Sequence, residues 1–60
     1  MNKVIFENKQ EIVVFLEDGY LLHTHKTNLS QHHSLDTWPD FESAQKAFER
    51  GHVRWGELET

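Results

Sequence analysis

The sequence predicts a small α+β domain, an antiparallel sheet of three to four strands with one helix packed on one face. Runs of β-branched and aromatic residues separated by turn residues predict the strands. An Asp-Gly pair between two of these runs predicts a hairpin. An amphipathic segment bounded by proline and glycine predicts the helix. The predicted order is β-β-β-α-β, and residues 1–60 are expected to form one domain.

The first half of the chain predicts three strands. Residues 3–7 are rich in Val, Ile and Phe, residues 8–10 suit a turn, and residues 11–17 contain five consecutive apolar side chains. Asp18-Gly19 is typical of a two-residue type I′ turn, in which both central positions need positive φ. Residues 20–25 then form the return strand.

The second half predicts a loop, the helix and a last strand. Residues 26–37 are polar and read as a long loop, anchored by Leu29 and Leu35. The helix is expected to begin near Pro39 and to stop at Gly51, with its apolar stripe on the sheet. Alternation over 52–55 predicts a short strand, whose place in the sheet the pattern leaves open, and 56–60 is expected to be a frayed acidic tail. The stripe consists of Phe41, Ala44, Ala47 and Phe48.

The predicted hairpin register makes both sheet faces apolar. A type I′ turn at Asp18-Gly19 places Phe15 opposite Leu22 and Leu16 opposite Leu21. One helix can cover only one face, so the loop, a second copy of the chain or a different protein should cover the other. The first face would hold Val4, Phe6, Val13, Phe15 and Leu22. The second would hold Ile5, Ile12, Val14, Leu16, Leu21, His23 and His25.

Composition excludes several classes of function. The net charge is -4 and the six basic residues are scattered, so no direct nucleic-acid binding is expected. The chain has no cysteine, which excludes disulfides and thiolate metal sites. No signal peptide or membrane-spanning apolar stretch is visible, and the expectation is a soluble, cytoplasmic protein.

Catalysis is not expected from these residues. The three glycines stand singly and form no phosphate-binding loop, and no serine lies in a nucleophile elbow. Ser34, His32, His33 and Asp36 include the residue types of a triad, but adjacency in sequence does not supply triad geometry. A chain of this size also leaves little room for a substrate pocket of about 300 Å³.

The leading hypothesis is therefore a non-catalytic protein-interaction or regulatory domain that binds another protein or itself as a homodimer. A sharper version is a phage-type inhibitor that occupies a basic nucleic-acid-binding groove, an analogy of size and charge only. A structural or assembly subunit is the other alternative. The predicted interaction surface comprises apolar Ile12, Val14, Leu16 and Leu21 with acidic Glu17, Asp18, Asp40 and Glu42.

Histidines supply a further hypothesis, a metal-binding module. His23 and His25 are two apart on a predicted strand, so their side chains point to the same face. Two imidazoles could hold Zn²⁺ or Ni²⁺ with a third ligand. Zinc is the cofactor this alternative implies, and the leading hypothesis implies none. The candidate third ligands are His32, His33, His52, Asp36 and Asp40.

Overall fold

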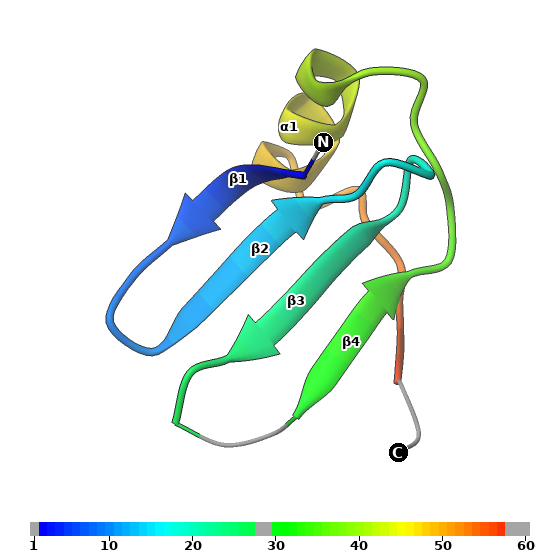
Figure 1. Cartoon of the computed structure of the whole chain (residues 1–60). Coiled ribbons are helices and arrows are strands. Elements are labelled where there is room, and N and C mark those ends of the chain that lie inside the picture. Colours follow the sequence, from blue (N-terminus) through cyan, green and yellow to red (C-terminus); the bar gives the residue numbers. More distant parts are fainter. Residues whose placement is uncertain (1, 28–29, 58–60) are drawn as a thin grey trace.

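The computed structural model describes residues 2–27 and 30–57. In this part of the chain, one antiparallel sheet in the order β1-β2-β3-β4-β5 is joined by one helix, α1 (Figure 1). The α+β prediction is confirmed, with five strands in place of three to four. The elements are β1 Lys3–Glu7, β2 Glu11–Phe15, β3 Leu21–His25, β4 Gln31–Ser34, α1 Phe41–Glu49 and β5 Trp55–Glu57.

Strand β4 lies inside the segment that was predicted to be a loop. It pairs antiparallel with β3, with His32 opposite His23. Its buried end is held by polar contacts: Ser34 Oγ accepts a hydrogen bond from the Leu21 N–H and donates one to the Asp36 carbonyl, both at 2.8 Å. Apolar alternation cannot reveal such a strand, so the loop prediction for 26–37 was wrong over β4. The predicted Leu29 anchor lies outside the described residues.

The β2–β3 turn contains three residues, Glu17 to Gly19, instead of two. Gly19 has φ +93°, and no described non-glycine residue has positive φ, which excludes a type I′ turn at Asp18-Gly19. The Gly19 N–H donates to the Leu16 carbonyl at 3.0 Å, and the Leu16 N–H donates to the Tyr20 carbonyl at 2.8 Å. This longer turn shifts the predicted register by one residue.

The shifted register changes which residues share a face. Phe15 lies opposite Leu21, and Val14 lies opposite Leu22. Leu21 therefore lies on the helix side with an exposed fraction of 0%. The prediction that Leu21 shares a face with Val14 was wrong.

Strand β1 follows the predicted Asn8 turn but contains an irregularity. Asn8 Oδ1 accepts hydrogen bonds from the Gln10 and Glu11 N–H groups, each at 2.8 Å. Along β1 the pairing shifts between Val4, which lies opposite Val14, and Phe6, which lies opposite Val13. Such a bulge turns neighbouring side chains to new faces. Val4 thus shares a face with Val14, whereas the prediction placed it on one face with Phe6 and Val13.

Helix α1 begins at Phe41, two residues after Pro39. Asp40 is the N-cap with extended backbone, and its side chain accepts a hydrogen bond from the Ser43 N–H at 2.8 Å. Pro39 therefore precedes the cap instead of opening the helix. The predicted stop is confirmed: Arg50 is the C-cap and Gly51 follows with φ +70°.

The core lies between α1 and one face of the sheet. Phe48 packs on Phe6 with ring centroids 5.7 Å apart, and Phe41 packs edge-on against Phe15 at 6.3 Å. The predicted apolar stripe thus lies on the sheet. The apolar core residues that are fully buried are Val13, Leu21 and Ala44.

The one described helix, α1, is neither long enough nor apolar enough to cross a membrane.

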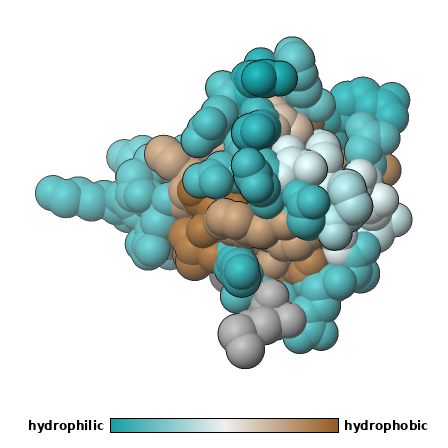
Figure 2. Space-filling view, turned by 90° about the horizontal axis from the view of Figure 1, so that it is seen from above, coloured by the Kyte–Doolittle hydropathy of each residue, from teal (hydrophilic) through white to brown (hydrophobic). Residues whose placement is uncertain are grey.

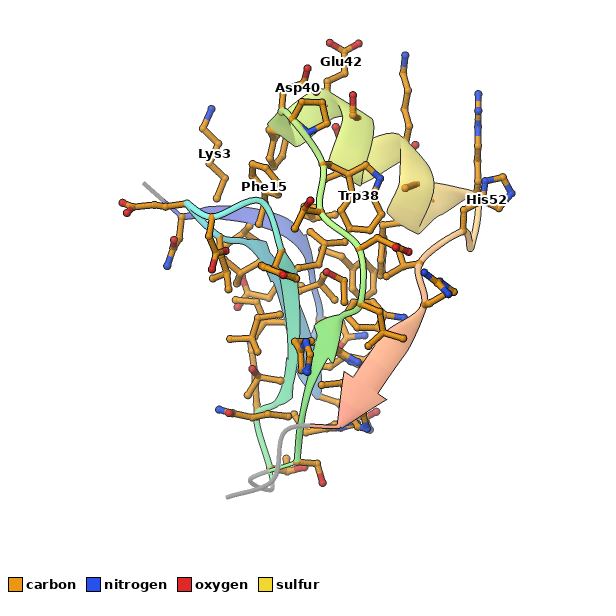
Figure 3. The ribbon with its side chains drawn as sticks, turned by 90° about the vertical axis from the view of Figure 1, so that its right-hand side faces the viewer. Lys3, Phe15, Trp38, Asp40, Glu42 and His52 are labelled. Carbon is orange, nitrogen blue, oxygen red and sulfur yellow. The ribbon has the colours of Figure 1, made fainter. Side chains whose placement is uncertain are left out.

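The final strand lies further along the chain than predicted. β5 begins at Trp55, which lies opposite Ser34, and it runs antiparallel to β4 at the edge of the sheet. Gly56 and Glu57 therefore belong to the sheet, which contradicts a tail from residue 56, and residues 58–60 lie outside the described residues. Viewed edge-on, α1 and β5 lie on the same side of the other four strands (Figure 3).

Candidate functional site

The sheet has two faces of different character. Side chains of directly opposed residues share a face, so the register assigns each strand residue to the helix face, beneath α1, or to the opposite outer face. None of the described elements lies over the outer face (Figure 1). The outer face comprises Val4, Glu7, Ile12, Val14, Leu16, Tyr20, Leu22, Thr24, Gln31, His33, Leu35 and Gly56, with charged Glu7 at its β1–β2 turn end, where it pairs with Lys26.

The centre of the outer face is apolar and uncharged. Val4 is 50% exposed, while Ile12, Val14 and Leu22 are half-buried against their strand neighbours. Figure 2, which views the α1 end of the molecule and not the outer face itself, shows apolar surface in the middle of that end with polar side chains around it. An uncovered apolar surface on a sheet is the feature expected of a protein-binding face.

The β4–β5 side of the outer face is closely packed. Tyr20 and His33 meet edge-on with ring centroids 6.5 Å apart, and His33 Nδ1 lies 2.9 Å from the Ser34 carbonyl oxygen. Leu35, 51% exposed, lies against Gly56, where a Cβ would stand 2.8 Å from Leu35 Cδ2. Gly56 thus lets Leu35 extend the apolar surface across the sheet edge.

Three of the four apolar residues predicted for an interaction surface lie on the outer face: Ile12, Val14 and Leu16. Leu21, the fourth, is buried beneath α1 and cannot contact a partner. Leu22 takes its place, because the three-residue turn moves every β3 residue by one position relative to β2.

The four predicted acidic residues come from two neighbouring segments. Glu17 and Asp18 lie in the β2–β3 turn, and Asp40 and Glu42 lie at the start of α1. A hydrogen bond of 3.0 Å from the Trp38 N–H to the Gly19 carbonyl holds these segments together. They form the acidic end of the molecule.

The acidic end also contains cations. Lys46 lies 3.5 Å from the Glu42 carboxylate, and Lys3 lies over the Phe41 ring, 5.4 Å from its centroid. Lys3, Asp40 and Glu42 project at the same end of the molecule (Figure 3). The Ser43 N–H lowers the pKa of Asp40 by donating a hydrogen bond to its carboxylate.

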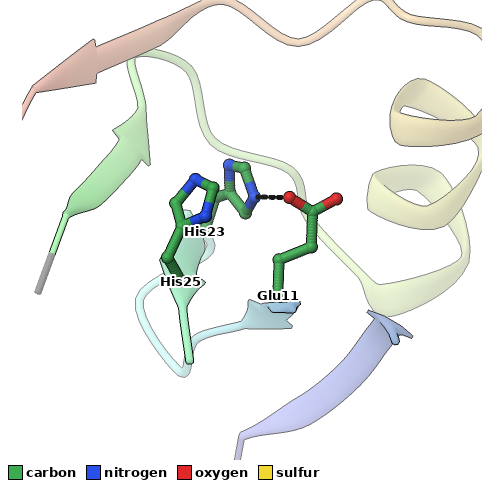
Figure 4. A group of neighbouring side chains, drawn as sticks. All are labelled: Glu11, His23 and His25. Carbon is green, nitrogen blue, oxygen red and sulfur yellow. Dashed lines mark hydrogen bonds and ion pairs between the residues drawn. The ribbon is translucent and has the colours of Figure 1, made fainter. Parts of the chain in front are cut away.

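The histidine pair lies on the helix face, beyond the part that α1 covers. His25 is directly opposite Glu11, and His23 Nε2 is 3.1 Å from Glu11 Oε2. One nitrogen or oxygen atom from each of the three side chains lies within 4.8 Å of the others (Figure 4). The His23 and Glu11 side chains are 23% and 31% exposed, so the cluster is half-buried but accessible.

Glu11 is the cluster member that the sequence did not predict. The type I′ register would place it opposite Lys26, on the other face from His25, whereas the observed register places it beside both histidines. If a three-residue turn at Glu17 to Gly19 had been predicted, the resulting register would have placed Glu11 opposite His25.

The candidate third ligands that the sequence did suggest are dispersed. His32 lies opposite His23 on the same face, with ring centroids 6.1 Å apart, while His33 lies on the outer face. Asp36 accepts two hydrogen bonds from Arg54, at 2.8 and 3.1 Å, which lower the pKa of Asp36. Asp40 caps the start of α1. His52 lies at an exposed position after the end of α1 (Figure 3).

In comparisons with known proteins, no family model matches the chain, and no curated protein or solved structure gives a significant match. The outer face, the acidic end and the histidine cluster are therefore the features of the chain that bear on its function.

Proposed function

We propose that the chain is a non-catalytic protein-interaction domain that binds a second copy of itself through the outer face. The observation that carries this proposal is the apolar, uncharged centre of that face, formed by Val4, Ile12, Val14 and Leu22 and left uncovered by every described element. Burial of apolar surface favours association by about 25 cal/mol per Å² removed from water, and the freedom lost on association offsets part of that gain.

The small core favours a second copy as the occupant. A 60-residue domain buries only about 60% of its unfolded surface and is marginally stable alone. The fully buried apolar residues are few in the described chain (Val13, Leu21 and Ala44), and no cysteine is available for a disulfide. Sheet-on-sheet pairing would add a second apolar layer, the outer face of each copy covering the other.

Area and charge are compatible with such a dimer. A standard interface buries about 800 Å² per partner, close to a fifth of the 4398 Å² that the chain exposes. A two-fold axis brings the same patch of both copies together. Because the centre of the patch carries no ionised side chain, the net charge of -4 does not place like charges against each other there.

The surroundings of Ser34 support a non-catalytic role. In the described residues, the Ser34 hydroxyl is bonded to two backbone groups, the Leu21 N–H and the Asp36 carbonyl. These bonds occupy the hydroxyl that the triad hypothesis would have required as a nucleophile.

Sedimentation velocity of the untagged chain over a range of concentrations tests the dimer. The wild-type chain should shift from monomer to dimer as its concentration rises. Leu22→Lys and Val14→Lys place a charge at the centre of the outer face and should remain monomeric, with unchanged circular dichroism. Thr27→Lys adds the same charge at an exposed position past β3 and should dimerise normally.

Two outcomes contradict the proposal. A wild-type chain that stays monomeric at every concentration has no dimer to explain. Dimerisation that Leu22→Lys and Val14→Lys leave intact would assign the interface to another surface.

A second candidate is an inhibitor that presents the acidic end to a basic nucleic-acid-binding groove. The hydrogen bond between Trp38 and Gly19 favours this candidate. It holds the β2–β3 turn against the start of α1, and so brings Asp18 and Glu42 with their acidic neighbours to one end of the molecule. Proteins retained on the immobilised chain should then be displaced by salt and by duplex DNA. An Asp18→Asn/Glu42→Gln chain should retain less of them, and retention that survives both treatments contradicts this candidate.

A further inference from the structure

We propose that Glu11, His23 and His25 form a Zn²⁺ site that spans strands β2 and β3. The two imidazoles come from alternate positions of β3, and the carboxylate comes from the β2 residue opposite His25. All three side chains project from the helix face toward one point (Figure 4). This site lies on the other side of the sheet from the outer face, so it is independent of the proposed dimer.

The distances suit a tetrahedral metal ion. Zn²⁺ binds nitrogen and oxygen ligands at about 2.0–2.1 Å, which separates two ligands of a tetrahedron by about 3.3 Å. His23 Nε2 and Glu11 Oε2 are 3.1 Å apart and so already stand at nearly that separation. One ring nitrogen of His25 lies within 4.8 Å of a ligand atom of each of the other two side chains, a gap that rotation of its half-buried ring can close.

The hydrogen bond between His23 and Glu11 indicates how the ion would enter. When His23 Nε2 carries the proton, it donates to the Glu11 carboxylate, and a Zn²⁺ ion would take its place between the same two atoms as the Nε2 proton passes to water and Nδ1 takes one up. The proton on the neutral ring would then reside on Nδ1, the usual arrangement for an imidazole that ligates through Nε2.

The ligand types select the class of metal. Two imidazoles and one carboxylate suit Zn²⁺, Cu²⁺ and Ni²⁺, whereas Mg²⁺ and Ca²⁺ prefer all-oxygen sites. Three protein ligands leave one tetrahedral position for water. Affinity should follow the usual order for divalent ions, with Cu²⁺ bound more tightly than Zn²⁺.

The scaffold holds the ligands in place. His23 lies opposite Val13, which is 1% exposed. The ring centroids of His23 and Trp55 are 5.6 Å apart. Packing on both sides fixes the inner end of the cluster, while the partly exposed Glu11 leaves a path for the ion. Because the unfolded chain does not hold these three groups together, metal binding should stabilise the fold.

Native mass spectrometry and calorimetric titration of the untagged chain with ZnCl₂ test the site. We expect one Zn²⁺ per chain and a melting temperature that rises with zinc concentration. Glu11→Gln and His25→Asn are near in size to the native side chains and should each weaken zinc binding by at least the roughly 10–100-fold that loss of a supporting partner costs. His33→Asn and His52→Asn remove imidazoles on the outer face and after α1 and should bind zinc like the wild type.

Trp55 supplies an independent readout close to the site. Cu²⁺ quenches indole fluorescence at short range, so one equivalent should quench the wild-type chain strongly. The quenching should be lost in Trp55→Phe, with Trp38 left as the background, and in Glu11→Gln.

Three results would overturn the proposal. One is the absence of zinc binding by the folded wild-type chain. Another is a Glu11→Gln chain that binds as tightly as the wild type, which would leave two imidazoles and no three-ligand site. The last is one Zn²⁺ shared by two chains, which would place the ligands between molecules. Circular dichroism of each metal-free variant separates lost ligation from lost folding.

Discussion

Val13 and His23 lie directly opposite each other across β2 and β3, and they mark the border between the apolar and polar parts of the helix face. Val13 is 1% exposed, whereas the His23 side chain is 23% exposed and contacts Glu11. The register that joins them also sets Leu22 opposite Val14 on the outer face. One turn thus determines the core, the outer face and the histidine cluster together.

The two leucines at the start of β3 should respond differently to truncation. Leu21→Ala creates a cavity in the core and should lower the free energy of unfolding by about 2–5 kcal/mol. Leu22 is half-buried on the outer face, so Leu22→Ala should cost the isolated monomer clearly less and should weaken dimerisation instead. Urea denaturation at low protein concentration measures both, and equal losses would contradict the register.

Gly19 should tolerate alanine far less well than Gly51. Both glycines have positive φ, but a Cβ at Gly19 would stand 3.0 Å from the Trp38 carbonyl oxygen and 3.3 Å from Thr37 Cβ. A Cβ at Gly51 meets nothing within 4 Å. Gly51→Ala should therefore cost only the backbone term, about 1–2 kcal/mol, and Gly19→Ala should cost more.

Thermal unfolding of the two alanine variants measures this difference. Equal losses at both positions would mean that the contact between the β2–β3 turn and the segment before α1 does not constrain Gly19.

Ser34→Ala should expose the role of the buried hydroxyl. The substitution leaves the Leu21 N–H without its acceptor, which should cost about 1–3 kcal/mol. Amide hydrogen exchange gives a residue-specific check: Leu21 should lose protection, while the Val13 amide on β2 keeps it. Unchanged exchange at Leu21 would show that its amide is satisfied by another group.

Asp40 should make stability depend on pH. The Ser43 N–H lowers the pKa of the folded-state carboxylate, so its stabilising effect is fully present above the unfolded pKa of about 3.9 and is lost as pH falls through the lower folded value. Asp40→Ala should lower the melting temperature at pH 7 and change it much less near pH 2. Asp40→Asn keeps a capping oxygen and should lie between the two. An Asp40→Ala penalty that is the same at both pH values would contradict the charged cap.

The parts of this fold that the sequence reveals are those held by apolar packing. The Phe41–Phe48 stripe, the Gly51 stop and the runs of β1 and β2 carry periodic or β-branched side chains, and the structure contains each of them. Strand β4 has the sequence Gln-His-His-Ser, and hydrogen bonds rather than an apolar pattern hold it, so composition indicates a loop.

The candidate sites depended on a detail that composition does not encode. Asp-Gly suits two hairpin turns that differ by one residue, and only the three-residue form keeps Asp18 out of positive φ. The shorter turn predicted Leu21 for the surface and separated Glu11 from the histidines. Leu22 and Glu11 follow once the turn length is known.

The most direct test of the outer face is an isotope-filtered NOE measurement on a mixture of ¹³C-labelled and unlabelled chains. The proposed dimer predicts intermolecular NOEs from the methyl groups of Val14 and Leu22, and none from Val13 or Leu21 beneath the helix. Intermolecular NOEs confined to other surfaces, or none at concentrations where the mass is that of a monomer, would contradict the proposal that the outer face pairs with itself.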